Sequence, residues 1–444
     1  MKTQRQGGGR LATAWRVLRA EGWRSAVLRA RDRLSERGER RRAAQVSAGN
    51  LGAAPVLNVL GLPFAARLGG VPVQLRNRLA LESEDRPCAV LHPGAPGWQL
   101  EHLSRGERRR LVRGPAPLDE AVRWALEEVR ASAVHCEGLA GLSVDRLGAL
   151  AGEGVRLLFS VHDYSFFCRR THLVEKPHER FCEYSRDLVR CDACLGHETG
   201  MIAGAQALYR ERTSALLRAA EAVVFPSAFL RHLHAELFPG LSPERLFAIE
   251  PGTPPVPGPP PARRAAVRHV AWVGSVHVHK GALVFEEVVR RLQAEGPRLR
   301  FTALGGGEPW LLARFRALPE LSVRGYWRAG SLPGVLRRLG VDLALLPSVT
   351  PEAYGLTLDE CWRAGVSAIA FDHGAMADRV RRLGGGLLVP PRDGAAGIAR
   401  AVREAAARAL PAAPDGARLP EPRHAAAAHL DLYRRLGLLP GRSA

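Results

Sequence analysis

Long apolar runs are missing from the 444-residue sequence. This absence excludes a membrane-spanning helix, which needs about 18 consecutive apolar residues. The N-terminus also lacks the apolar core and the Ala-x-Ala cleavage site of a secretory signal. Both absences favour a cytoplasmic location. Cysteine is scarce, with seven residues, and in that compartment we expect reduced thiols or metal ligands rather than disulfides.

Lysine is scarcer still, because it occurs only at positions 2, 176 and 280, while Lys and Arg together number 64. A lysine at a defined place in this arginine-rich chain is therefore informative. The net charge of +20 indicates anionic partners: nucleotides, nucleic acid or an anionic membrane surface. No zinc-finger, RNP or helix-turn-helix pattern is present, so we do not expect nucleic acid as a partner.

Residues 1–50 form a basic, partly helical leader that carries a net charge of +9. Apolar residues, among them Trp15 and Trp23, recur in it at roughly helical spacing between arginines. Such a segment is typical of a helix in an anionic membrane interface. A solvated leader without a partner is the alternative.

Beyond the leader, short apolar runs alternate with helical patterns, which predicts an α/β protein with parallel sheets. Seven prolines within 251–262 interrupt the alternation and indicate a linker. We therefore expect two doubly wound, Rossmann-like domains facing a cleft, with ligands at the carboxyl ends of the strands. The predicted parts are an N-terminal domain at 51–250, a linker at 251–267, a C-terminal domain at 268–415 and a last segment at 416–444 whose helix packs back on the N-terminal domain.

The most informative stretch is PSVTPEAYGLTLDECWRAG, residues 347–365, which follows a predicted buried strand. Glu352 and Glu360 form an E-x7-E pair around Gly355. A helix that begins near Gly355 would leave the backbone N–H groups of Gly355, Leu356 and Thr357 ready for a phosphate. A helix that merely has acidic residues near its start is the alternative.

With its surroundings, this stretch resembles the donor-sugar motif of retaining GT-B glycosyltransferases of family four. HVAWVGSVHVHKGALVFEEVV, residues 269–289, resembles the first strand, phosphate loop and helix of their C-terminal domain. The resemblance assigns Gly274 to the phosphate loop and Lys280 to the donor diphosphate. The family often has arginine where this chain has Ser275, so one cationic phosphate contact is either missing or supplied by His277, His279 or another arginine. An ordinary surface lysine is the alternative for Lys280.

Other segments resemble the family in the same order. VRGYW, residues 323–327, places Gly325 and Tyr326 beside the nucleobase. RLGGVPVQLRNRLA, residues 67–80, places Gly69 and Gly70 near the diphosphate. LLFSVHDYSFFC, residues 157–168, matches His162 to the family's histidine beside the donor sugar. A structural histidine is the alternative for His162.

Four cysteines follow the His-Asp-Tyr sequence: Cys168, Cys182, Cys191 and Cys194. Some polysaccharide-type family members resemble this arrangement, usually with proline where this chain has Arg169. Four thiolates that include a C-x2-C pair are suited to a tetrahedral structural zinc. Free thiols or a disulfide are the alternatives.

The resemblance implies a metal-independent hexosyltransferase that needs no cofactor for catalysis. It would move a sugar from a nucleotide sugar to a glycan or lipid-linked acceptor with retained configuration, in bacterial cell-surface polysaccharide biosynthesis. Lys280 would stabilise the leaving diphosphate, while Glu352 and His162 would orient the sugar. Membrane binding through residues 1–50 would make the protein peripheral at the inner membrane face. The alternatives are a catalytically silent GT-B protein that binds nucleotide or glycan and a sugar-nucleotide epimerase.

Overall fold

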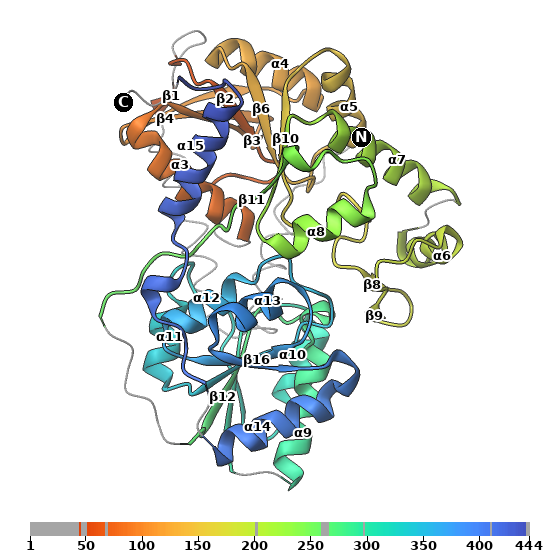
Figure 1. Cartoon of the computed structure of the whole chain (residues 1–444), viewed down its shortest axis with the longest axis vertical. Coiled ribbons are helices and arrows are strands. Elements are labelled where there is room, and N and C mark those ends of the chain that lie inside the picture. Colours follow the sequence, from red (N-terminus) through yellow and green to blue (C-terminus); the bar gives the residue numbers. More distant parts are fainter. Residues whose placement is uncertain are drawn as a thin grey trace, which may run out of the picture. The chain divides into compact units, whose positions relative to one another are not determined.

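Two compact units make up the protein, and each contains its own sheet (Figure 1). The computed structural model describes residues 44–45, 51–66, 70–199, 203–258, 266–295, 298–408 and 411–440. The N-terminal unit comprises the described residues up to Pro254 and from Pro420 onward, and the C-terminal unit those within Pro255–Leu419. The predicted leader at 1–50 lies outside the described residues, except for two residues of an edge strand. None of the helices described here has the length and apolarity to cross a membrane.

The N-terminal unit is built on a sheet that has nine strands within the described part of the chain, in the order β1-β5-β4-β3-β2-β6-β7-β10-β11. The six strands from β3 to β11 in this order are parallel. The central strands are fully buried, which explains their continuous apolar runs. The bounds are β1 Ala44–Gln45, β2 Val56–Val59, β3 Cys88–Pro93, β4 Trp98–Ser104, β5 Glu107–Arg113, β6 Ala133–Glu137, β7 Leu157–Ser160, β10 Ala222–Phe225 and β11 Leu246–Ala248.

The antiparallel strands β4 and β5 were not predicted from the sequence, which suggested only parallel strands with helices between them. Only Leu111 of β5 is fully buried, so its ERRRLVR sequence resembles a solvated basic segment. Arg105 and Gly106 form the connecting turn with φ values of 45° and 80°. Arginine is an unusual residue for such a turn, so the usual hairpin signal is missing.

Helices cover this sheet, and the last one returns from the end of the chain. Ser143 and Ser227 accept hydrogen bonds from backbone N–H groups in the first turns of α5 and α8. Helix α15 packs against α3 and buries Leu432 and Tyr433 among the strand residues Val56, Leu158 and Val224. The bounds are α3 Gly70–Asp85, α4 Leu118–Val129, α5 Val144–Gly152, α6 Leu188–Thr199, α7 Ala205–Ala219, α8 Ala228–Leu237 and α15 Pro422–Arg435, with a small ribbon of β8 Val174–Glu175 and β9 Arg180–Phe181.

The C-terminal unit contains a parallel sheet with six strands in the part of it that is described, in the order β14-β13-β12-β15-β16-β17. Helices α9 and α14 lie side by side on it (Figure 1). The strands are β12 His269–Val273, β13 Arg300–Leu304, β14 Leu321–Val323, β15 Leu343–Leu346, β16 Ser367–Phe371 and β17 Gly386–Val389. The helices are α9 Ala282–Glu295, α10 Pro309–Arg316, α11 Leu332–Leu339, α12 Leu356–Arg363, α13 Gly374–Leu383 and α14 Gly394–Ala407.

Single turns of 3-10 helix join several of these elements: η1 Pro243–Arg245, η2 Val278–Lys280, η3 Pro391–Asp393 and η4 Gly416–Arg418. Within the proline-rich segment, residues 251–258 form neither helix nor strand, and residues 259–265 lie outside the described part.

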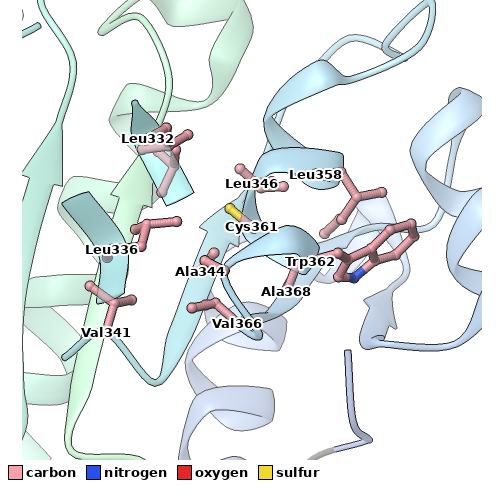
Figure 2. Packing of buried hydrophobic residues seen from close by; sticks show 14 of the residues in the cluster. Leu332, Leu336, Val341, Ala344, Leu346, Leu358, Cys361, Trp362, Val366 and Ala368 are labelled. Carbon is pink, nitrogen blue, oxygen red and sulfur yellow. The ribbon is translucent and has the colours of Figure 1, made fainter. Parts of the chain in front are cut away.

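Trp362 belongs to the buried core beneath α12, in the same cluster as Leu336, Leu346 and Leu358 (Figure 2). Its indole N–H donates a hydrogen bond to the carbonyl of Gly385 at 2.8 Å. The cluster therefore joins α11 and α12 to the sheet.

Replacing Trp362 with alanine should lower the stability of the C-terminal unit by about 3–5 kcal/mol, because it leaves a large cavity. Thermal and urea unfolding of the variant measure this loss. Trp310→Ala is the matched control, since Trp310 is 47% exposed, and it should change stability by less than about 0.5 kcal/mol. Equal losses in the two variants would contradict the assignment of Trp362 to this core.

Candidate functional site

The connections after β12 and β15 meet at the point where the strand order of the C-terminal sheet reverses. From β12 the chain continues to β13 and β14 on one side, whereas β16 and β17 lie on the other side of β15. Ligands of open parallel sheets bind outside the carboxyl ends of the strands at such a point. Lys280 follows β12 and Glu352 follows β15, so both predicted residues lie here.

Lys280 and Glu352 are in direct contact. Lys280 Nζ donates to Glu352 Oε1 at 2.6 Å, and the hydroxyl of Ser348 donates to the same oxygen at 2.6 Å. Both charged side chains remain partly exposed. The carboxylate is therefore oriented by two donors while the site stays accessible from solvent.

The two loops touch at a glycine. Gly281 has a φ of 81°, and a Cβ atom built on it would lie 1.8 Å from the carbonyl oxygen of Pro347. The backbone N–H of Val349 also donates to the carbonyl of His279 at 3.0 Å. A side chain at position 281 would push the loops apart, so glycine is required next to Lys280.

The segment from Ser348 to Glu352 is held from a second side by the loop before α13. His373 Nε2 donates to the carbonyl of Ser348 at 2.8 Å, and the N–H of Ala375 donates to the carbonyl of Glu352 at 3.1 Å. Burial lowers the pKa of His373, which favours the neutral ring in this role.

Helix α12 begins directly after Gly355, which has a φ of 86°. A Cβ atom there would lie 2.5 Å from Met376 Cγ, so both the conformation and the space require glycine. No side chain caps this helix. The first-turn N–H groups, including those of Leu356 and Thr357, are consequently available to an anion beside the positive end of the helix.

A buried ion pair and a hydrogen bond fix the orientation of α12. Asp359 forms an ion pair with Arg379 and accepts a hydrogen bond from the hydroxyl of Tyr354 at 2.9 Å. The guanidinium of Arg379 also lies 4.1 Å from the centre of the Tyr354 ring. These contacts fix the turn that carries Glu352 and Gly355.

Glu360 lies on the second turn of α12 and is partly exposed. Burial raises the pKa of its carboxyl group to about 7. The residue can therefore exchange a proton near neutral pH, and its ionised form accepts hydrogen bonds at both oxygens.

Glycines from neighbouring loops pack against one another at the ends of β12, β13 and β14. A Cβ atom on Gly305 would lie 1.7 Å from the carbonyl oxygen of Gly274, and the N–H of Gly305 donates to the carbonyl of Gly325 at 2.7 Å. A Cβ atom on Gly306 would lie 2.1 Å from the ring of Tyr326. The structure thus brings three predicted residues, Gly274, Gly325 and Tyr326, to one edge of the sheet.

Ser275 lies at the same edge, directly after Gly274. The nearby His277 is hydrogen-bonded through Nδ1 to Glu308 Oε1 at 3.0 Å and stacks on His279 with ring centres 5.4 Å apart. The loop after β12 therefore carries two stacked histidines, and His277 already has an anionic partner.

His162 lies in the N-terminal unit, two residues beyond β7, and lines a pocket together with Arg78 and Glu137. Its Nε2 atom is 3.0 Å from Glu137 Oε2. Arg78 Nη2 donates to the other carboxylate oxygen at 2.9 Å. Burial alone would raise the pKa of Glu137, but Arg78 and the hydrogen bond with His162 hold it well below its usual range.

The glycine pair at the start of α3 is described only in part. Gly70 is the first residue of that helix and is exposed. Gly69 lies outside the described residues, so its predicted role stays a prediction.

The four clustered cysteines line a second pocket, together with Arg170, Arg190 and Arg210. Backbone N–H groups of Arg170 and Lys176 lie 3.4 and 3.3 Å from the sulfurs of Cys168 and Cys194. Backbone N–H groups that point at sulfur stabilise the negative charge of a thiolate. In the described part of the chain, however, no three such side chains converge as metal ligands, and each of the four cysteines is a free thiol.

The zinc hypothesis therefore predicts a measurable metal content. The purified protein should contain about one zinc ion per chain, and Cys182→Ser should lose it. Cys361→Ala, which changes a buried cysteine of the C-terminal core, is the control and should retain it. Metal analysis that finds no zinc in the wild-type protein would contradict the hypothesis.

Several residues of these sites were not predicted from the sequence: Arg78, Glu137, Ser348 and His373. Glu137 is the last residue of β6, so a search for polar residues at the ends of parallel strands would have found it. Arg78 carries no such signal, because it is one of many arginines in helices and its burial depends on tertiary packing.

Comparisons with solved structures place this fold in a known class. Sucrose-phosphate synthase from Thermosynechococcus elongatus matches with a TM-score of 0.57 and 18% identity over 86% of this chain and 99% of that chain. Starch synthase IV from Arabidopsis thaliana, bound to ADP and acarbose, matches with a TM-score of 0.55 and 12% identity over 86% and 99%. Anabaena HepE in complex with UDP and glucose matches with a TM-score of 0.52 and 13% identity over 78% and 89%.

These likenesses define a GT-B fold of two Rossmann-like domains and confirm the predicted fold class.

No curated protein sequence matches the chain. Residues 267–408 match the model of a family described as glycosyl transferases group 1. This matched range contains Lys280, Glu352 and Glu360.

Proposed function

We propose that this protein is a retaining, metal-independent glycosyltransferase of the hexosyltransferase type. It transfers a sugar from a nucleotide sugar to a glycan or lipid-linked acceptor in the synthesis of cell-surface polysaccharide. The observation that carries the proposal is the contact of Lys280, Ser348 and Glu352 where the strand order reverses, within the domain that matches group 1 glycosyltransferases. HepE, which has the same fold, has been solved with UDP-glucose.

In this proposal the diphosphate of the donor binds Lys280 and the N–H groups at the start of α12. A lysine beside an uncapped helix N-terminus is suited to bind a diphosphate. Gly274 and Ser275 bring the backbone of the phosphate loop close to it. Glu360 accepts hydrogen bonds from the ribose hydroxyls, and Gly325 and Tyr326 border the base.

The acceptor hydroxyl attacks the anomeric carbon from the face that the diphosphate leaves. The carbon–oxygen bond to the diphosphate breaks, the new glycosidic bond forms, and a phosphate oxygen of the donor takes the hydroxyl proton. Lys280 and the start of α12 stabilise the charge that develops on the diphosphate. Glu352 and His162 hold the sugar, so no covalent intermediate with the protein is needed.

The N-terminal unit supplies the acceptor side of this reaction. A lipid-linked acceptor would be reached at a membrane surface, to which the basic leader at 1–50 would bind the protein. The leader lies outside the described residues, so this part rests on its charge and its tryptophans alone.

Removing either member of the central ion pair should abolish most turnover. Lys280→Ala and Glu352→Gln should each lower kcat by about 10²–10³-fold, as expected when a group that stabilises developing charge or orients the sugar is lost. Steady-state transfer assays with the preferred nucleotide sugar measure the effect, and thermal unfolding checks that the fold is retained.

Two substitutions elsewhere serve as matched controls. Lys176→Ala changes a lysine of the N-terminal unit that pairs with Glu179, and Glu287→Gln changes a surface carboxylate that pairs with Arg291. Both should leave kcat unchanged. Wild-type rates in Lys280→Ala and Glu352→Gln would refute the proposed function.

Binding of the nucleotide sugar should depend on pH through Glu360. Because burial raises the pKa of this carboxyl group to about 7, it is mostly neutral at pH 6 and mostly ionised at pH 8. If the ribose binds the ionised form, affinity should be about tenfold weaker at pH 6 than at pH 8.

The probe is whichever sugar conjugate of UDP, GDP, ADP or dTDP raises the unfolding temperature most. Its phosphodiester groups do not titrate between pH 6 and 8, so the protein is the source of any change. Glu360→Gln should remove the pH dependence. Equal pH dependence in the two proteins would contradict the assignment of Glu360 to the ribose.

A catalytically silent nucleotide-binding protein is a second candidate, favoured by serine at position 275. It would show the same thermal shift with a nucleotide sugar but no transfer. Turnover with any acceptor, lost in Lys280→Ala, excludes it.

A further inference from the structure

His162 lines the pocket of the N-terminal unit and contacts Glu137 through Nε2. We propose that Glu137 is a positioning residue, which fixes Nε2–H of His162 toward itself and thereby makes Nδ1 an acceptor for a hydroxyl group of the substrate. The inference deepens the proposed function and rests on it for the identity of that hydroxyl, which belongs to a sugar.

The carboxylate of Glu137 is fixed on its other side, because Arg78 donates a hydrogen bond to its second oxygen. Arg78 is itself fixed by Asn58 Oδ1 at 2.5 Å and by an ion pair with Glu82 at 3.3 Å. The side chains of Arg78, Glu82 and Glu137 are at most 7% exposed. An ionised carboxylate carries no hydrogen, so in the 3.0 Å contact the hydrogen belongs to Nε2 of His162.

The other ring nitrogen of His162, Nδ1, is then a hydrogen-bond acceptor. In the neutral ring, a hydrogen on Nε2 leaves a lone pair on Nδ1. None of the described residues forms a hydrogen bond with Nδ1. A lone pair attracts a hydroxyl and repels a phosphate oxygen, so this edge of the pocket is suited to a neutral sugar rather than to the diphosphate.

The other titratable groups around this pocket do not compete for His162. His135 Nε2 lies 2.9 Å from the hydroxyl of Ser160 and its Nδ1 lies 2.7 Å from that of Tyr433. His429 Nδ1 lies 2.8 Å from the carbonyl of Ala425. Burial lowers the pKa of His135 to about 3 and that of His429 well below its usual range, so both rings are neutral. Glu137 is thus the residue that fixes the orientation of His162.

The variant Glu137→Gln tests the inference, because Arg78 dictates how the new amide lies. Arginine is a donor only, so the amide oxygen must face Arg78 and the amide NH2 must face His162. Nε2 then becomes the acceptor and the ring hydrogen moves to Nδ1. The tautomer of His162 should therefore change in long-range 15N–1H NMR spectra, with His162→Gln used to assign the signals.

The kinetic readout is a fall in kcat of about 10²-fold in Glu137→Gln, with KM for the nucleotide sugar changed less than about twofold. Glu82→Gln is the matched control, since it also removes a buried carboxylate from Arg78 but does not touch His162. It should keep both the wild-type tautomer and the wild-type kcat.

An unchanged His162 tautomer in Glu137→Gln would overturn the inference. An equal fall in kcat in the two variants would also overturn it, because Glu137 would then act only on the stability of the buried charge cluster. The NMR experiment needs no substrate. If the wild-type protein transfers no sugar while the tautomer changes as expected, the proposed function fails and the orientation by Glu137 stands.

Discussion

The close approach of the loops after β12 and β15 is the constraint on which the C-terminal site depends. Gly281 lies against the carbonyl of Pro347 without room for a Cβ atom. This contact brings Lys280 and Glu352, 72 residues apart in sequence, within hydrogen-bond distance. The segment from Ser348 to Glu352 is also held by the loop before α13, and the ion pair of Asp359 with Arg379 fixes the turn that follows it. Lys280, Glu352 and the start of α12 therefore form one rigid arrangement. Little reorganisation would then be needed when a donor binds.

The N-terminal unit achieves a similar rigidity with buried charges. Removing Arg78, Glu82 and Glu137 from water is costly unless each ion has partners of good geometry. The cluster pairs Arg78 with Glu82 and Glu137, and Asn58 accepts a further hydrogen bond from Arg78. One oxygen of Glu137 faces the pocket through His162. A cluster that stabilises the core therefore also sets the polarity of the pocket wall.

Most of the fold and the C-terminal site could be predicted from the sequence, because both depend on local patterns. Continuous apolar runs mark buried parallel strands, and Lys280, Gly355 and Glu360 stand at fixed distances from them. The hairpin of β4 and β5 could not be predicted in this way, since its turn uses Arg105 and its outer strand is full of arginine. Arg78 was missed because its function depends on residues brought together only by folding.

The C-terminal helix has a consequence for the order in which the protein assembles. The described residues of the C-terminal unit all fall within 255–419, so they have been made before α15 exists. The N-terminal unit is discontinuous, because α15 joins it from beyond the C-terminal unit and brings Leu432 and Tyr433 onto Val56, Leu158 and Val224. The unit that is synthesised first is therefore the one that is completed last. Until α15 has been synthesised, the apolar residues Val56, Leu158 and Val224 lack the side chains that bury them in the finished unit.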